Sequence, residues 1–328
     1  MSELFNPDGL VLSANYASTM DDVVLPYLTA HGTDENVSAF DGTKLYVSRY
    51  RSDAQSRGSV FLVHGFTESA VKFSELIYSL LQNGFDVVAY DQRGHGRSGR
   101  EEGLSDPSVT HVEHFDDYEK DFASVCKAME GKMPKPWCVF CHSMGGAVTA
   151  LFLMRHPDVF SRAALCAPMI AVNRKHMPFF LLKAICRAFR IVGKGKQLLF
   201  ISKPYSGLET FEGACATGRE RFEWYALFKD THPAFQNYSP SYAWLSEALG
   251  VSQKLLWPPA PKKIACPVKI YSAGDDWEVN NFAQKLFVRG LKQGQLVTVD
   301  GAYHEIYRSK DETLFPWWND VLGFLQGS

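Results

Sequence analysis

Short apolar runs that alternate with helical segments are the feature that most constrains the fold of this chain. The apolar runs lie at 60–63, 85–90, 137–140, 163–166, 268–272 and 296–299. Helical patterns lie near 72–83, 115–129, 281–291 and 315–325, and another begins after residue 143. Strands that are apolar along their length and joined by helices form a mostly parallel sheet with both faces covered. The pattern therefore predicts an α/β fold whose mostly parallel sheet is flanked by helices.

The sheet is expected to begin with an antiparallel hairpin. Asp41-Gly42 separates the strand candidates 37–40 and 43–51, and an Asp-Gly pair between two such runs is a strong signal for a tight turn. The residues before about 30 are read as a polar lead-in with one helical piece.

A long segment interrupts the alternation of strands and helices. It covers 170–261, is rich in Phe, Leu and Arg, and is read as helical. An insertion between strands at the carboxyl edge of such a sheet lies above the crevice where ligands bind. We therefore expect a core formed by 1–169 and 262–328, with 170–261 as a helical cap inserted late in the sheet.

A serine stands at the junction between a buried strand and a helix. Residues 141–146 read CHSMGG and follow the apolar run 137–140. In a nucleophile elbow the strand ends, the chain turns sharply through the nucleophile and a helix begins at once, so the flanking positions must be small. Cys141 and Gly145 flank Ser143 in this way. We expect His142 to be packed and to project away from Ser143, because successive strand residues point to opposite sides.

A serine hydroxyl is a weak nucleophile that needs a neighbouring base and a group that orients the base. His304 follows the last predicted strand and is the candidate base. Asp276 follows the preceding strand and is the favoured acid, with the adjacent Asp275 as its rival. Each of these residues comes at the carboxyl end of a strand, where loops can converge on Ser143.

A serine nucleophile also needs N–H donors that stabilise the oxyanion of the tetrahedral intermediate. The backbone N–H of Met144, directly after the nucleophile, is one candidate. The second is the N–H of Phe66, in the loop after 60–63, where Gly65 lets the chain turn.

With these residues in place, the chain resembles the α/β-hydrolase superfamily, and within it the lysophospholipase and monoacylglycerol lipase group, most of all the bacterial lysophospholipase type. The similar segments are VHGFTESAVKFSELIYSLLQNGFDVVAYDQRGHGRSGR, CHSMGGAVTALFLMRHP, YSAGDDWEV and GAYHEIYRSKDETL. The resemblance implies an α/β-hydrolase fold with Ser143 as nucleophile, Asp276 as acid, His304 as base, and Phe66 and Met144 as oxyanion donors. Cys141 departs from the family, which usually has Gly at that position.

Three other motifs are interpreted as structural. The stretch 94–99 matches G-x-G-x-x-G, but loop residues follow it instead of the helix that a dinucleotide site requires. Cys138 and Cys141 are expected to be small packed residues, since Cys138 lies inside the strand and a redox pair belongs at a helix start. His111 and His114 are spaced for one helix face and are read as surface residues.

The predicted cap contains an amphipathic helix with a basic stripe. Lys183, Arg187, Arg190 and Lys194 recur at spacings of four, three and four. This stripe indicates either a lid that touches an anionic lipid surface or, as we slightly favour, a packed helix with a solvated charged face. The cap is also aromatic, which suits either an acyl chain or plain packing. The candidate substrate contacts are Phe179, Phe180, Trp224 and Tyr225.

Composition narrows the class of function. The net charge of −2 gives no general attraction to nucleic acid. The seven cysteines are odd in number and scattered, which is typical of reduced thiols. No signal peptide or membrane span is evident, so we expect a cytoplasmic chain whose cap can touch the inner face of the membrane. We predict a serine carboxylic-ester hydrolase that cleaves the acyl ester of a lysophospholipid or a monoacylglycerol through an acyl-enzyme, without cofactor or metal. The alternatives are a broad esterase or thioesterase, or a non-catalytic binding protein on the same fold.

Overall fold

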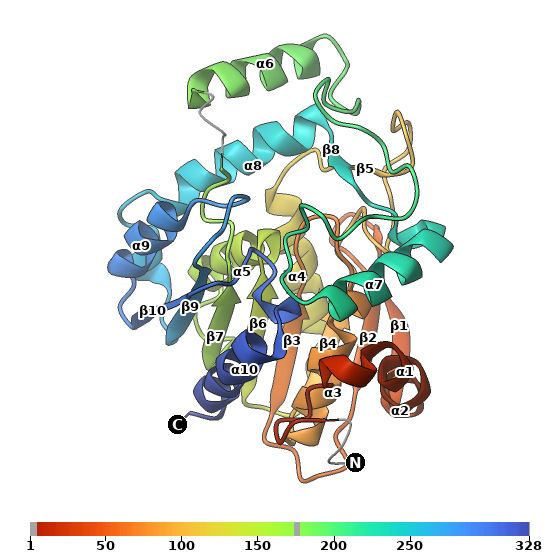
Figure 1. The fold of residues 1–328 in the computed structure, drawn as a ribbon. Coiled ribbons are helices and arrows are strands. Elements are labelled where there is room, and N and C mark those ends of the chain that lie inside the picture. Colours follow the sequence, from red (N-terminus) through yellow and green to blue (C-terminus); the bar gives the residue numbers. More distant parts are fainter. Residues whose placement is uncertain (1–4, 174–177, 328) are drawn as a thin grey trace.

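The computed structural model describes residues 5–173 and 178–327. Its central sheet has the strand order β1-β2-β4-β3-β6-β7-β9-β10 (Figure 1). The first three strands along the sheet pair antiparallel, and all the following pairs are parallel. The predicted fold class is therefore confirmed. The strands are β1 (Gly32–Ser38), β2 (Lys44–Tyr50), β3 (Ser59–Val63), β4 (Asp86–Tyr90), β6 (Trp137–His142), β7 (Arg162–Cys166), β9 (Val268–Ala273) and β10 (Gly294–Val299).

The predicted hairpin is formed by β1 and β2. The Ala39 N–H donates to the Thr43 carbonyl at 2.8 Å, and the Thr43 N–H donates to the Asp41 carboxylate at 3.0 Å. Gly42 has φ of +88°, a conformation that L side chains rarely adopt. The Asp-Gly pair thus supplies both the hydrogen-bond acceptor and the backbone freedom that the turn requires.

Helices cover both faces of the sheet, as the apolar strands predict. Successive side chains of β3 alternate between two hydrophobic clusters, with Phe61 in one and Leu62 in the other. The first cluster contains side chains of α4 (Asp116–Met129), α5 (Met144–Arg155) and α9 (Asn281–Gly290). The second contains side chains of α3 (Ser74–Gln82) and α10 (Asp311–Gln326). The helix predicted at 315–325 begins four residues earlier, with Asp311 and Glu312 in its first turn.

The N-terminal lead-in is more helical than expected and packs on the second cluster. It contains η1 (Ser13–Asn15), α1 (Tyr16–Thr19), η2 (Met20–Val24) and α2 (Leu25–His31). Further short turns of helix are η3 (Ala70–Phe73), η4 (Pro233–Phe235), η5 (Pro261–Lys263) and η6 (Ile306–Arg308).

The described part of 170–261 contains the helices α6 (Phe179–Ile191), α7 (Arg219–Thr231) and α8 (Tyr242–Leu255), and its residues 192–218 form no helix. Figure 1 shows α6 stacked on α8, with both lying beyond one end of the sheet strands. A short strand in this segment, β8 (Ser239–Pro240), pairs with β5 (Val109–Thr110) from the loop before α4. No helix in the described residues combines the length and the apolar character needed to cross a bilayer.

Candidate active site

Ser143 occupies a sharp turn between β6 and α5, with φ of +50° and ψ of −117°. A non-glycine residue in this conformation is strained and is usually found where function requires it. The turn is crowded on both sides. A Cβ atom at Gly145 would lie 2.2 Å from the Val63 carbonyl oxygen, and one at Gly146 would lie 2.4 Å from the Pro168 side chain. The glycines after Ser143 therefore allow α5 to begin directly against the neighbouring strand ends.

The departure at Cys141 fits this crowded turn. Cys141 is fully buried in β6, with its Sγ atom 3.8 Å from the Ala164 carbonyl oxygen. Burial raises the pKa of the Cys141 thiol to about 12. Cys138, also buried, contacts the Ser161 hydroxyl at 3.3 Å. The two residues are packed thiols, as the sequence indicates.

Ser143, His304 and Asp276 lie in hydrogen-bonding contact. His304 Nε2 is 2.8 Å from Ser143 Oγ, and His304 Nδ1 is 2.8 Å from Asp276 Oδ2. The other Asp276 oxygen accepts the backbone N–H groups of Glu278 and Val279 at 2.8 and 3.1 Å. The structure thus brings Asp276 to His304 and leaves the rival Asp275 exposed.

The surroundings of His304 and Asp276 favour a charged pair. Burial opposes ionisation of Asp276, but hydrogen bonding and the charge of His304 hold its pKa below the ordinary value. Burial likewise disfavours the imidazolium of His304, yet the hydrogen bond and charge of Asp276, assisted by Glu278 and Glu305, raise its pKa. A base held in this way can accept a proton from Ser143 and have its cation stabilised.

The two predicted N–H donors belong to the residue directly after Ser143 and to the loop after β3. Met144 is the first residue of α5, so its N–H has no carbonyl one helical turn earlier. The Phe66 N–H has no hydrogen-bond acceptor among the residues that the structure describes. A Cβ atom at Gly65 would lie 3.0 Å from Ser143 Cβ, which shows how closely this loop passes the serine. Both N–H groups are therefore available to a ligand.

The four aromatic candidates do not gather in one place. The Trp224 indole is buried between α7 and the N-terminal segment, with its N–H donating to Asp21 at 2.9 Å. Tyr225 is also buried, and its hydroxyl lies 3.2 Å from the Ser69 hydroxyl. These contacts place both rings in the packing that fixes α7 to the core.

Phe179 and Phe180 lie at the start of α6. Phe180 is largely exposed, whereas Phe179 lines an apolar groove of about 410 Å³ between α8, α9 and the segment after β7. Trp257 and Phe282 line the same groove with exposed rings. Phe179 thus lines a cavity of apolar character, whereas Trp224 and Tyr225 are packed against the core.

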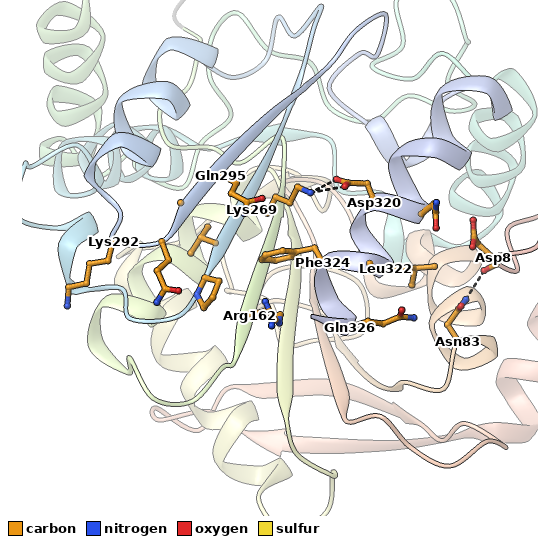
Figure 2. Close-up of a pocket in the computed structure, with 16 residues that line it drawn as sticks. Asp8, Asn83, Arg162, Lys269, Lys292, Gln295, Asp320, Leu322, Phe324 and Gln326 are labelled. Atoms are coloured by element: carbon orange, nitrogen blue, oxygen red, sulfur yellow. Dashed lines mark hydrogen bonds and ion pairs between the residues drawn. The ribbon is translucent and has the colours of Figure 1, made fainter. Parts of the chain in front are cut away.

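A larger cleft lies at the opposite edge of the sheet. It encloses about 890 Å³ and is lined by Arg162, Lys269 and Asp320 among other mainly polar residues (Figure 2). Arg162 and Lys269 stand near the starts of β7 and β9, whereas Ser143 and Asp276 follow the ends of β6 and β9. This cleft is therefore separate from the candidate active site.

One expectation about the histidines is wrong. His111 is buried in the extended loop before α4, and its Nδ1 atom lies 2.9 Å from the Ser241 hydroxyl. It forms neither part of a helix face nor part of the surface, because β8 pairs with β5 beside it and Ser241 contacts its ring. His114 is exposed, as expected.

Within the described residues, no group of three or more His, Cys, Asp or Glu side chains is arranged to hold a metal ion.

Sequence reasoning did not find a charged cluster beside the serine. Glu68 and Tyr307 contact the buried His142 ring, and Lys72 pairs with Glu68. The sequence signal for this cluster is the Glu68–Lys72 spacing of four residues. The stretch 94–99 forms a loop in which the Asp91 carboxylate accepts the Arg97 N–H at 2.9 Å.

The fold, the serine elbow and the Ser143–His304–Asp276 contact together define an α/β-hydrolase of the serine hydrolase class. Residues 54–311 match the family model Hydrolase_4, serine aminopeptidase S33, and the chain belongs to this family. It is 32% identical to lysophospholipase L2 of Escherichia coli K12 over 282 residues, which cover 80% of this chain and 78% of the relative. It is 23% identical to a monoacylglycerol lipase of Mycolicibacterium smegmatis, over 86% of this chain and 93% of that one.

A solved structure has the same fold. A soluble variant of monoglyceride lipase from Saccharomyces cerevisiae, in complex with a substrate analog, superimposes with a TM-score of 0.68 at 22% identity. The match covers 89% of this chain and 93% of that one.

Proposed function

We propose that the protein hydrolyses the acyl ester of a lysophospholipid or a monoacylglycerol through an acyl-enzyme on Ser143. The observation that carries the proposal is the contact of Ser143 with His304 and of His304 with Asp276. The substrate class rests on the relatives, whose names are lysophospholipase and monoacylglycerol lipase.

In the proposed reaction, His304 Nε2 takes the hydroxyl proton as Ser143 Oγ attacks the ester carbonyl. The Phe66 and Met144 N–H groups receive the oxyanion of the tetrahedral intermediate. His304 then gives its proton to the leaving alcohol, which leaves an acyl-Ser143 ester. Water deprotonated by His304 attacks this ester, and the fatty acid leaves as Ser143 regains its proton. Asp276 orients His304 and stabilises its cation throughout.

We further propose that 170–261 acts as a cap over a core formed by 1–169 and 262–328. Its helices α6 and α8 lie beyond the strand ends that carry Ser143 (Figure 1). The ring of Phe66 packs at a tilt of 40° against Trp244 of α8, with centroids 4.1 Å apart, so the cap contacts the proposed oxyanion loop directly. The apolar groove beside Phe179 suits an acyl chain.

The basic stripe of the cap is divided between residues that contact the protein and residues that are exposed. Arg190 pairs with Glu113 and Glu247 at 2.7 Å each, and Lys183 donates to Gln253 at 2.7 Å. These two cations bind the protein itself. Their hydrogen bonds to Gln253 and Glu113 lie at the surface.

Apolar side chains are exposed at both ends of α6. Phe180, Ile191 and Val192 are 75%, 77% and 66% exposed. Arg187, four residues before Ile191, and Lys194, two residues after Val192, are also exposed. An exposed apolar face flanked by cations suits insertion at an anionic membrane surface. We propose that the protein binds such a surface peripherally through this face.

The test combines a fluorophosphonate probe with two lipid substrates. The probe should label Ser143, located by peptide mapping, and the Ser143→Ala variant should remain unlabelled. Purified enzyme should release fatty acid from lysophosphatidylcholine or from monoacylglycerol. Absence of labelling would overturn the mechanism. Labelling with turnover confined to short soluble esters or thioesters would overturn the lipid substrate.

A further inference from the structure

Glu68 is a buried carboxylate that no step of the proposed hydrolysis uses. It lies in the loop after β3 with its side chain almost fully enclosed. Its Oε2 atom accepts the Gly65 N–H at 2.6 Å and lies 2.9 Å from His142 Nδ1. Its Oε1 atom accepts hydrogen bonds from Lys72 Nζ at 3.0 Å and from the Tyr307 hydroxyl. Four donors therefore converge on one side chain directly beside the proposed oxyanion loop.

His142 lies between two groups that accept hydrogen bonds. Nδ1 faces the Glu68 carboxylate at 2.9 Å, and Nε2 faces the backbone carbonyl oxygen of His304 at 3.2 Å. A neutral imidazole carries one N–H, so it can satisfy one of these acceptors and sets a lone pair against the other. Both contacts are satisfied only when both ring nitrogens carry protons. The ring is enclosed, so water does not replace either contact.

The charges around Glu68 favour its ionised form. Burial opposes ionisation, but the charges of His142 and Lys72 and the hydrogen bonds from His142 and Tyr307 hold the pKa of Glu68 well below its ordinary value. Lys72 also pairs with Glu305 at 2.5 Å. An isolated buried charge is costly. The Glu68 carboxylate and a cation on His142 therefore each stabilise the charged form of the other.

We propose that Glu68 and His142 form a buried ion pair that positions both the oxyanion loop and the catalytic base. Glu68 fixes Gly65, directly before the Phe66 donor, while His142 fixes the backbone of His304. The pair thus joins the loop after β3, the serine elbow and the loop after β10. Glu68 and His142 are positioning residues, since neither contacts the Ser143 hydroxyl. This role rests on the proposed triad mechanism, but the charge state of His142 is measurable without it.

The first experiment uses the full-length wild-type protein labelled with ¹⁵N-histidine. Nitrogen NMR distinguishes an imidazolium, with two protonated ring nitrogens, from either neutral tautomer. We expect the assigned His142 ring to show two protonated nitrogens, because both ring nitrogens face hydrogen-bond acceptors. A neutral His142 ring at pH 7 would overturn the ion pair.

The second experiment measures steady-state kinetics of the Glu68→Gln and His142→Gln variants. We expect kcat to fall by about 10- to 100-fold with KM little changed, because misplacing reacting groups by about 1 Å costs about 10²-fold. Glu119→Gln is the matched control, since Glu119 is also buried and pairs with Arg155 and His156 away from the serine. Its kcat should stay within about twofold of wild type.

The pH dependence of kcat/KM distinguishes a positioning role of His142 from general damage to the fold. The His142 and His304 ring centroids lie 4.8 Å apart, so a cation on His142 disfavours a second one on His304. In His142→Gln the acidic groups facing His304, namely Asp276, Glu278 and Glu305, all remain. The pKa of His304 should then rise, and the acid limb of kcat/KM should move to higher pH by about 0.5–1 unit.

Each result has a distinct meaning. An unmoved acid limb, or equal losses in the Glu119→Gln control, would assign Glu68 and His142 a structural role only and overturn the proposal. If the wild-type protein fails to label at Ser143 while His142 is an imidazolium, the hydrolytic mechanism fails but the ion pair stands. Should both variants fail to fold, the wild-type NMR measurement still decides whether the pair exists.

Discussion

The Oγ atom of Ser143 lies 2.8 Å from Nε2 of His304, although 161 residues separate them in the chain. Central β6 positions the serine, and the loop after edge strand β10 positions the histidine. Parallel strands end at the same edge of the sheet, so the two loops meet there. The contact is short enough for direct proton transfer.

Replacing Ser143 by Ala should abolish ester hydrolysis while leaving the fold intact. Loss of the nucleophile in a serine hydrolase lowers kcat by about 10⁶-fold. Fatty-acid release and thermal unfolding should be measured on the same preparation. A variant that keeps wild-type turnover would show that Ser143 is not the nucleophile.

Asp276→Asn should lower kcat by about 10⁴-fold, because an amide no longer fixes the required tautomer of His304. Asp275→Asn is the matched control. Asp275 is adjacent in sequence and exposed, whereas Asp276 lies 2.8 Å from His304 Nδ1. The control should stay close to wild type in a soluble-ester assay. Equal losses in the two variants would contradict the assignment of Asp276.

Acid should destabilise the fold partly through Glu305. Burial opposes ionisation of this carboxyl, but the charges of Lys72 and Arg308 lower its pKa to about 2. The unfolded value is about 4.3. The folded pKa is the lower one, so this contribution is complete above about pH 4.3 and is lost as the pH falls towards 2.

Urea unfolding of wild type and Glu305→Gln between pH 2 and 6 checks this prediction. The variant should be less stable at pH 6, because Lys72 and Arg308 lose their shared carboxylate, and its stability should fall less steeply with acid. Parallel curves would show that Glu305 does not titrate with folding.

Arg221→Ala should destabilise the protein by about 3–5 kcal/mol, because it leaves the buried Glu75 carboxylate and the partly buried Asp311 carboxylate without their partner. The Arg221 side chain is fully buried and pairs with Glu75 at 3.0 Å and with Asp311 at 2.7 Å. It thereby fixes α7 to α3 and α10. The control on the same helix is Arg219→Ala, which breaks the exposed Arg219–Glu223 pair and should change the unfolding free energy by under about 1 kcal/mol.

Sequence patterns predicted the parts of this molecule that depend on short-range order. The positions of the strands followed from apolar runs in the sequence. The positions of Ser143, Asp276 and His304 followed from their place directly after these runs, among small or polar residues. The buried state of His111 did not, because a loop residue carries no periodic signal and its cover comes from β8. Glu68 and His142 meet only through tertiary packing, 74 residues apart.

The orientation of α6 was beyond sequence analysis for a related reason. Helical periodicity separates an apolar from a basic side but does not indicate which side meets the protein. Here Glu113 and Glu247 bind Arg190, and part of the apolar side is left outward. Partners distant in the chain decide this orientation.

That orientation yields the last prediction. Ile191→Ser with Val192→Ser should weaken binding to vesicles of anionic phospholipid and lower turnover of lipid substrate there, with turnover of a soluble short-chain ester unchanged. Both side chains are exposed, so the substitutions should change the stability of the folded core little. Each side chain offers apolar area that can be buried in the membrane, so its loss should weaken binding. Leu227→Ser is the control, since Leu227 is exposed on α7. Cosedimentation with vesicles measures the effect, and equal binding by both variants would assign membrane contact to another surface.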